Sequence, residues 1–443
     1  IEIDNCVGYR ILGLFPLNVK SHFKMYERLM KGLVERGHQV DVISCFPLDT
    51  PIKNYTDIVI DELAAEHIDE FTYDLLPVYN GLNQFKVIAT MVGNDVCDGI
   101  VKNSKVQDII NNPPKNPPYD LIIMELVAGN CFMALGHKLN IPVIAVSSSF
   151  WPWTSAITPQ DEIIKKTFGP STPGLMELEK QFDLFLLNTH PSLDDPIPRV
   201  PGLIEVGGLH ALNDDGPELS VADKKWLDES TDGFIYFTFG SFAVTESFPL
   251  STIQAFYKSF AKLAPIRILM KVKQPERLPP GLPDNVKIFT WISQPKVLKH
   301  KNIRAFITHG GLMGTQEAVL YGVPMIGVPL FCDQFTNVDL YVRKNIAIRL
   351  EHKEITEQKL DFALKEILKN PMYRNNAKKL AIKFRDRPSS PLDTACYWIE
   401  YIGRHGKNAL RSPTLDLAWW QVQLLDVYAA VLFAITIILI IST

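Results

Sequence analysis

The sequence predicts an α/β protein made of two facing parallel-sheet domains and a C-terminal membrane helix. Short apolar segments alternate with amphipathic helical segments along the chain, which is the pattern of parallel sheets covered by helices on both faces. A chain of 443 residues is also too long for one hydrophobic core, so two large domains are expected. Finally, the chain closes with an uncharged apolar stretch at residues 427–441.

The first series of strands is predicted at residues 11–15, 40–44, 121–126, 143–147 and 184–188. Each segment is largely apolar on both faces, as buried parallel strands are. Residues 21–36 are predicted to form an amphipathic helix between the first two strands, with Gly37 at its C-cap. Strand one therefore ends in a loop that leads into this helix. One side of the helix carries Phe23, Tyr26, Met30 and Leu33.

A second series is predicted at residues 234–239, 267–272, 286–290, 305–308 and 325–328. Residues 196–217 are rich in Pro, Gly and Asp and are interpreted as an interdomain linker. Two Rossmann-like domains that face one another are the simplest architecture. We expect an N-terminal domain at 1–205 and a C-terminal domain at 206–395. A helix at 396–414 would pack back toward the N-terminal domain, and 415–443 would be the membrane segment.

Composition and charge limit the functional classes. Hydrophobic residues make up 47% and charged residues 21%, which is typical of a folded protein. A net charge of −4 offers no basic excess for nucleic acid. The cysteines lack the close paired spacing of a zinc site, so we predict no metal and interpret them mainly as buried thiols, with a disulfide left open. They are Cys6, Cys45, Cys97, Cys131, Cys332 and Cys396.

The two ends of the chain give information about the cellular location of the protein. No signal peptide precedes Ile1, so the chain looks already processed. At the other end, Trp419 and Trp420 precede the apolar stretch and suit an interfacial aromatic belt, although a buried C-terminal helix is the alternative. Asn54 begins an Asn-Tyr-Thr glycosylation acceptor that would be used if the body is lumenal.

One strand end carries the features of a diphosphate site. After residues 305–308 come His309, Gly310 and Gly311, and then a helix that contains Gly314, Thr315 and Glu317. Glycines let the backbone approach a ligand, and a helix N-terminus with free N–H groups favours an anion. Glu317 could accept hydrogen bonds from ribose hydroxyls. Alternatively, His309 is an ordinary turn histidine and Glu317 a solvated helix charge.

Three other strand ends could complete a nucleotide site. Trp291 offers a stacking face and Gln294 an amide edge, a combination that suits uracil. Asp333 and Gln334 could hold sugar hydroxyls, and Ser241 ends a small turn near the phosphates. Taken singly, Trp291 could be core packing and Asp333 a helix N-cap. We favour the joint interpretation because four separate strand ends together supply the groups that a nucleotide requires.

His22 is the candidate catalytic base. It lies at the mouth of strand one and at a helix N-terminus, where the dipole keeps an imidazole neutral and basic. Glu125, at the end of the strand at 121–126, is expected to orient it, with Asp120 as the weaker candidate. A lone His22 would otherwise be a surface or capping residue. Apolar segments at 71–81, 85–91 and 150–153 are expected to build a pocket for a lipophilic acceptor.

The order and spacing of these pieces resemble the UDP-glycosyltransferase family over nearly the whole chain, and the wording ITHGGLMGTQEA looks most like insect members. The resemblance implies a GT-B type inverting enzyme that needs no bound cofactor and uses a UDP-sugar as co-substrate. It places Trp291 on uracil and Gln294 at the base edge. It also implies that Ser241 and His309 meet the diphosphate, Glu317 the ribose, and Asp333 with Gln334 the sugar.

Two positions depart from that family pattern. Vertebrate relatives commonly show asparagine where this chain has Met313, so no side-chain polar contact to phosphate is expected there. The family usually shows aspartate where this chain has Glu125, which adds a methylene to the presumed dyad.

The implied function is transfer of a hexose, most consistently glucose because of the insect-like wording, to a hydroxyl of a small lipophilic acceptor. A UDP-glucuronosyltransferase, a non-catalytic carrier of lipophiles and an epimerase of UDP-sugars remain alternatives. The implied location is the endoplasmic reticulum membrane, with a single span and the catalytic body in the lumen. No nucleic-acid partner is expected, and a homo-oligomer is left open.

Overall fold

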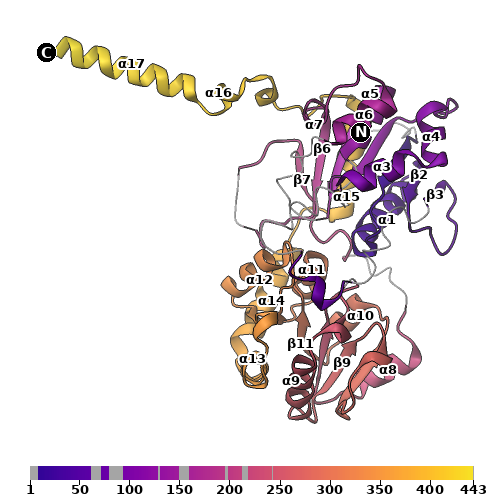
Figure 1. Ribbon diagram of the computed structural model, residues 1–443, viewed down its shortest axis with the longest axis vertical. Coiled ribbons are helices and arrows are strands. Elements are labelled where there is room, and N and C mark those ends of the chain that lie inside the picture. Colours follow the sequence, from indigo (N-terminus) through magenta and orange to yellow (C-terminus); the bar gives the residue numbers. More distant parts are fainter. Residues whose placement is uncertain are drawn as a thin grey trace.

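The computed structural model describes residues 8–60, 71–78, 93–127, 130–148, 159–194, 198–211, 218–241 and 243–442. Two parallel sheets form an N-terminal and a C-terminal unit, and a long helix extends away from both (Figure 1). The predicted α/β class with two Rossmann-like units is confirmed.

The N-terminal sheet has the strand order β3-β2-β1-β4-β5-β6-β7. All five predicted strands are present within two residues of their expected ends. Two edge strands were missed: β3 directly follows Asn54, and the three-residue β7 lies inside the predicted linker. That linker is therefore partly structured, because its residues 203–205 pair with β6. The strands are β1 (Arg10–Phe15), β2 (Gln39–Ser44), β3 (Tyr55–Val59), β4 (Leu121–Glu125), β5 (Val143–Ser147), β6 (Phe182–Leu187) and β7 (Leu203–Glu205).

The C-terminal sheet has the order β10-β9-β8-β11-β12-β13. The five strands predicted for it are confirmed, and the three-residue edge strand β13 was missed. Only one of the three residues of β13 is buried, so this strand lacks the apolar run on which a sequence prediction depends. The strands are β8 (Phe234–Thr238), β9 (Arg267–Lys271), β10 (Val286–Phe289), β11 (Ile303–Thr308), β12 (Met325–Gly327) and β13 (Ala347–Arg349).

Helices cover both sheets (Figure 1). Those of the N-terminal half are α1 (Lys20–Glu35), α3 (Val96–Val101), α4 (Ser104–Asn111), α5 (Met133–Leu139), α6 (Pro159–Phe168) and α7 (Leu175–Glu179). Those that follow are α8 (Val221–Asp228), α9 (Leu250–Ala261), α10 (Gln294–Lys299), α11 (Leu312–Leu320), α12 (Gln334–Arg343), α13 (Glu357–Lys369), α14 (Pro371–Arg385), α15 (Pro391–His405), α16 (Trp419–Val422) and α17 (Leu425–Ser442). Short 3-10 turns are η1 (Tyr73–Leu75), η3 (Asn130–Phe132), η4 (Thr245–Ser247), η5 (Pro275–Arg277), η6 (His352–Glu354) and η7 (Pro413–Asp416).

Strand alternation explains the two cores of the N-terminal unit. Leu12 and Leu14 of β1 face one apolar layer, whereas Ile11 and Phe15 face the other. The second layer receives the buried face of α1, which includes the predicted Phe23, Tyr26, Met30 and Leu33. It also receives α15. Glu400 of this helix accepts a hydrogen bond from Arg36 Nε at 2.6 Å. A helix from the far end of the chain thus packs on the N-terminal unit, and it begins at Pro391.

The strand order reverses at one point in each sheet. In the first sheet β1 lies beside β4, and in the second β8 lies beside β11. Loops that leave neighbouring strands at such a point diverge to opposite faces of the sheet and leave room for a ligand between them. The loops after these four strands therefore define where a site is expected.

Residues 71–78 correct one expectation. They were assigned to an acceptor pocket in the first domain, but Phe71 and Leu76 belong to the apolar core of the C-terminal unit. Phe71 forms a bridge with Ala243, and its ring lies 4.3 Å from that of Phe331. Figure 1 shows this dark violet segment among the orange elements of the second unit. Residues 79–81 of the same expected segment and the other expected pocket segments, 85–91 and 150–153, lie outside the described residues.

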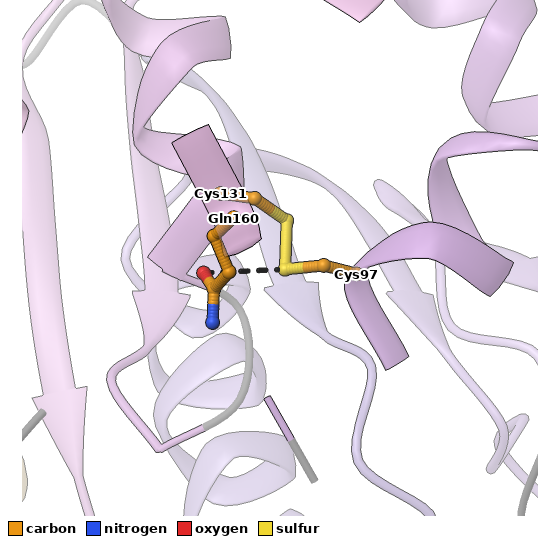
Figure 2. Close-up of a disulfide and its surroundings, with 3 residues drawn as sticks. All are labelled: Cys97, Cys131 and Gln160. Atoms are coloured by element: carbon orange, nitrogen blue, oxygen red, sulfur yellow. Dashed lines mark hydrogen bonds between the residues drawn. A yellow bond between two sulfur atoms is a disulfide. The ribbon is translucent and has the colours of Figure 1, made fainter. Parts of the chain in front are cut away.

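The cysteines also differ in part from expectation. Cys97 and Cys131 form a disulfide that ties α3 to η3, so the interpretation as buried thiols was wrong for this pair. Figure 2 shows Gln160 beside this bond, with its Oε1 3.5 Å from the Cys97 Sγ. Within the described ranges, Cys332 and Cys396 are free thiols.

The C-terminal helix α17 projects from the body (Figure 1). It is 18 residues long with a mean hydropathy of 2.5, and none of it is buried inside the protein. The alternative of a helix buried in the core is therefore excluded, and by length and composition α17 could cross a membrane.

Candidate active site

His22 and Glu125 form a hydrogen-bonded pair at the point where the first sheet reverses. His22 lies in the first turn of α1, directly after β1, and Glu125 ends the neighbouring β4. The His22 Nδ1 lies 2.9 Å from the Glu125 Oε1, and their side chains are 24% and 1% exposed. An ionised carboxylate only accepts hydrogen bonds, so Nδ1 carries the proton and Nε2 remains the basic nitrogen.

Tyr26 is a third member of this group that sequence reasoning assigned only to the apolar face of the helix. Its hydroxyl donates to the same Glu125 Oε1 at 3.0 Å, and its ring stacks on Phe15. Burial, followed by the charge of Glu125, raises the pKa of Tyr26 well above its usual value, so it remains a donor. The sequence feature that could have identified Tyr26 as a site residue is its spacing of four residues from His22, which places both on one side of a helix.

His309 occupies the corresponding point of the second sheet, directly after β11. Its ring lies between two glycines: a Cβ on Gly240 would lie 2.7 Å from its Cε1, and one on Gly311 would lie 2.6 Å from its Nε2. Burial, with Lys271 nearby, lowers the pKa of His309 to about 4, so the ring is neutral at pH 7. Its buried Nδ1 has no hydrogen-bond partner within the described chain. A polar ligand could therefore bind it.

The N-terminus of α11 follows this histidine and has no side-chain cap. The first-turn N–H groups of an α-helix have no partner in the helix and attract anions. Gly310, with φ +87°, makes the turn that aims the chain into this helix, and a Cβ there would meet Val338 at 2.4 Å. The strand, turn and uncapped helix together form a site suited to phosphate.

Two residues of α11 point elsewhere. Thr315 was expected to contribute to the nucleotide site, but it is fully buried, and its hydroxyl hydrogen-bonds to Gly311 O at 3.1 Å and to the Tyr341 hydroxyl at 3.1 Å. Its side chain therefore supports the helix instead of a ligand. Met313, the departure from the family pattern, packs against the N-terminal core. The absence of a polar side chain there thus coincides with an apolar interunit contact.

Trp291 and Gln294 follow β10, and Gln294 contacts Glu317 of α11. Trp291 follows β10 and is 48% exposed, so its indole is not core packing. The Gln294 Nε2 donates to Glu317 Oε2 at 2.6 Å, and Gly314 permits this approach because a Cβ there would lie 3.0 Å from that nitrogen. Burial raises the pKa of Glu317, which is only 7% exposed and thus not a solvated helix charge.

Asp333 and Gln334 follow β12. Asp333 occupies the N-cap position of α12 but makes no cap bond; instead its Oδ2 accepts from Asn337 Nδ2 at 2.8 Å. Burial raises the pKa of Asp333, and His22 opposes this shift from across the interface. The Gln334 Oε1 accepts the backbone N–H groups of Leu330 and Phe331. Its carbonyl therefore shapes the loop and is not open to a sugar.

Lys271 was not anticipated from the sequence. It ends β9, and its Nζ donates to Gly240 O at 2.7 Å, next to the exposed Ser241. Burial, followed by repulsion from Lys24, lowers the pKa of Lys271 to about 8. A cation thus lies beside the turn expected to meet phosphate. Its only sequence signal was its place at a strand end.

The two units are joined by a buried hydrogen-bond network beside this site. Gln316 of α11 accepts from Gly208 N at 2.9 Å and donates to Asn188 O at 2.8 Å. Both polar groups of its amide are thus used between the units. This contact fixes α11 against the end of β6, so the loops carrying His22 and His309 belong to one interface.

Comparison with known proteins agrees with this geometry. The family model described as "UDP-glucoronosyl and UDP-glucosyl transferase" matches residues 53–443. UDP-glycosyltransferase UGT5 of Dactylopius coccus is 30% identical over 99% of this chain and 92% of its own length. UDP-glucuronosyltransferase 2C1 of Oryctolagus cuniculus is 34% identical over 95% of this chain and 94% of its own length.

Solved structures show the same fold. A UDP-glucosyltransferase from Polygonum tinctorium, solved with 3,4-dichloroaniline, superposes with a TM-score of 0.66 at 14% identity and covers 90% of this chain and 100% of its own. The glycotransferase of kitacinnamycin gives a TM-score of 0.66 at 18% identity, with 89% and 99% covered. These neighbours are GT-B glycosyltransferases. The chain therefore belongs to the UDP-glycosyltransferase family and is an enzyme that transfers a sugar from a UDP-sugar donor.

Proposed function

We propose that this enzyme is an inverting transferase that moves glucose from UDP-glucose to a hydroxyl of a small lipophilic acceptor. The observation that supports it most is the pairing of His22 with Glu125 in one unit, within electrostatic range of Asp333 in the other. Acceptor activation and sugar binding would then lie on opposite sides of one interface.

In this mechanism, the second unit holds the donor. Trp291 stacks on uracil, Gln294 contacts its edge, and Glu317 binds ribose. The neutral His309 and the uncapped end of α11 bind the diphosphate, with Ser241 at its edge. Asp333 binds sugar hydroxyls. Gln334 contributes by holding the loop that carries Asp333.

In the chemical step, His22 Nε2 removes the proton of the acceptor hydroxyl as its oxygen attacks the anomeric carbon. The new C–O bond forms on the face opposite the breaking bond to the diphosphate, so the configuration inverts and UDP leaves with the electron pair. Glu125 stabilises the imidazolium that forms, as an acid does in hydrolase triads. A general base of this kind contributes about 10² to 10⁴-fold.

The choice of glucose over glucuronate depends on charge. A carboxylate-bearing sugar needs a cation at the sugar-binding loop, because an unpaired charge is costly to bury. Among the described residues, no lysine or arginine forms an ion pair with Asp333, whose carboxylate accepts from Asn337 instead. UDP-glucosyltransferase 2 of Dactylopius coccus, 31% identical over 95% of this chain, is named for this donor.

We further propose that the body lies in the lumen of the endoplasmic reticulum, anchored by α17. The Cys97–Cys131 disulfide supports an oxidising compartment. Asn54 of the glycosylation acceptor is exposed. Endoglycosidase treatment of the expressed protein should lower its apparent mass, and Asn54→Gln should abolish that shift. A wild-type protein that carries no glycan at this position would contradict the lumenal assignment.

The donor is tested with one generic phenol and three donors: UDP-glucose, UDP-glucuronate and UDP-N-acetylglucosamine. Product mass should show hexose addition with UDP-glucose as the preferred donor. A higher kcat/KM with UDP-glucuronate would overturn the glucose assignment. UDP release that depends on the phenol would exclude both a carrier and an epimerase, and His22→Ala should remove it.

A further inference from the structure

Three lysines surround the exposed indole of Trp291. The Nζ atoms of Lys24, Lys20 and Lys271 lie 4.9, 5.3 and 5.5 Å from the ring centroid. Lys271 belongs to the same unit as the indole, whereas Lys20 and Lys24 come from the first two turns of α1 in the N-terminal unit. The proposed base-stacking surface is thus approached by two cations from the acceptor side.

The two lysines of α1 lack a directly paired carboxylate among the described residues. Neither Lys20 nor Lys24 forms an ion pair with a carboxylate anywhere in the described ranges, and both side chains are exposed. Of the two, Lys24 is the lysine whose charge acts on other residues of the proposed site. It acts electrostatically on Lys271, which it repels, and on Glu317 at the proposed ribose site. Several positive charges around one ring repel each other, so a polyanion bound among them would be stabilised.

The strengths of the two possible contacts with the indole, by a base or by an ammonium, indicate where the lysines go when a nucleotide binds. A base gains more by stacking on an indole than an exposed ammonium gains by lying over it. A uridine base would therefore displace the lysines from the ring. Hydrogen bonds between an ammonium and a phosphate are charge-assisted and stronger than neutral ones, and the flexible stem of lysine can follow the phosphates.

We propose that Lys24 of α1 is a ligand of the donor diphosphate, supplied by the N-terminal unit across the interface. The inference rests on the proposed function, in which the C-terminal unit binds UDP-sugar. It adds that the acceptor-side helix, which also carries the base His22, takes part in donor binding. Occupation by the donor would then pull His22 toward the sugar, because both residues lie in the first two turns of α1.

The test compares Lys24→Met with Lys20→Met in the full-length protein. Methionine keeps the length of the side chain and removes the charge. Both positions are exposed, so both variants should fold, which thermal unfolding checks. Calorimetry with UDP should give a Kd about ten to a hundred times higher for Lys24→Met than for wild type. Lys20→Met should change the Kd less than about threefold, because Lys24 and not Lys20 is the charge that acts on Lys271 and Glu317.

Uridine separates contact with phosphate from contact with the base. Lys24→Met should bind uridine like wild type, and added salt should weaken UDP binding to wild type more than to the variant. If Lys24→Met binds UDP as tightly as wild type, or loses uridine binding to the same degree, the diphosphate contact is refuted. If wild type itself does not bind UDP, the proposed function fails, which is a different result.

Discussion

Replacing Glu125 by glutamine tests the proposed base most directly. The change keeps the shape of the side chain and an oxygen that can accept from His22 Nδ1 or from the Tyr26 hydroxyl, which now lie 2.9 and 3.0 Å away. It removes the negative charge that would stabilise the imidazolium. An amide can also donate a hydrogen bond, so it can favour the wrong tautomer of His22.

The size of the effect follows from the geometry. Two unit charges about 4 Å apart interact by about 4 kcal/mol at the effective dielectric of 20 that suits partly exposed pairs. His22 is 24% exposed and Glu125 only 1%, so this intermediate value applies. At 1.36 kcal/mol for each factor of ten, kcat should fall about a thousandfold. KM for UDP-glucose should hold within about threefold, since Glu125 does not line the proposed donor site.

The assay is steady-state UDP release with a phenol as acceptor. Asp120→Asn is the matched control, because Asp120 precedes the opposite end of the same strand and accepts from Arg10 N at 2.7 Å. It should leave kcat within about twofold. Combining Glu125→Gln with His22→Ala should cost little more than His22→Ala alone, since the two act as a unit. A Glu125→Gln enzyme that folds and keeps more than a tenth of wild-type kcat would refute the dyad.

Three further outcomes are expected. Trp291→Ala should raise the Kd for UDP about 5- to 150-fold, since stacking is worth about 1 to 3 kcal/mol; calorimetry that shows an unchanged Kd contradicts the role of the indole. Burial lowers the pKa of His210 to about 4, below the 6.5 of the unfolded chain, so stability is lost as pH falls from about 6.5 to 4. His210→Gln should reduce the slope of the free energy of unfolding against pH by about 1.4 kcal/mol per pH unit, as measured by urea unfolding. Equal slopes in the variant and the wild type would disprove the lowered pKa of His210. Cys131→Ser should lower the free energy of unfolding by about 3 to 4 kcal/mol, since the bond closes a loop with a sequence separation of 34. Cys332→Ser, at a free thiol, is the control, and a reduced wild type as stable as the oxidised one contradicts the estimate.

Much of the fold was predictable because it depends on local pattern. Strands such as β5 are apolar over their whole length, and α1 has a continuous apolar stripe that ends before Gly37. What failed were the short edge strands and residues 71–78. Phe71 looks like an acceptor-pocket residue in sequence, yet it packs in the core of the other unit. Nothing in a local pattern states against which sheet an apolar residue will pack.

The candidate site, like the fold, was predictable from the sequence only in part. Each strand-end motif was visible in the sequence, and so was the choice of His22 and Glu125, because parallel strands bring their carboxyl ends to one edge. The side-chain directions were not visible. Thr315 turns into the core, the carbonyl of Gln334 binds its own loop, and Tyr26 reaches Glu125.

The sequence by itself determined the family, the two sheets and the identity of the loops that meet between them. These features follow from residue type, period and spacing along the chain, which are local quantities. The tertiary structure alone decided that Lys24 lies over the Trp291 ring and that Cys97 bonds to Cys131. The partners in these pairs are 34 or more positions apart in the chain, and such contacts depend on how the packed units fit together rather than on any pattern that a single segment carries.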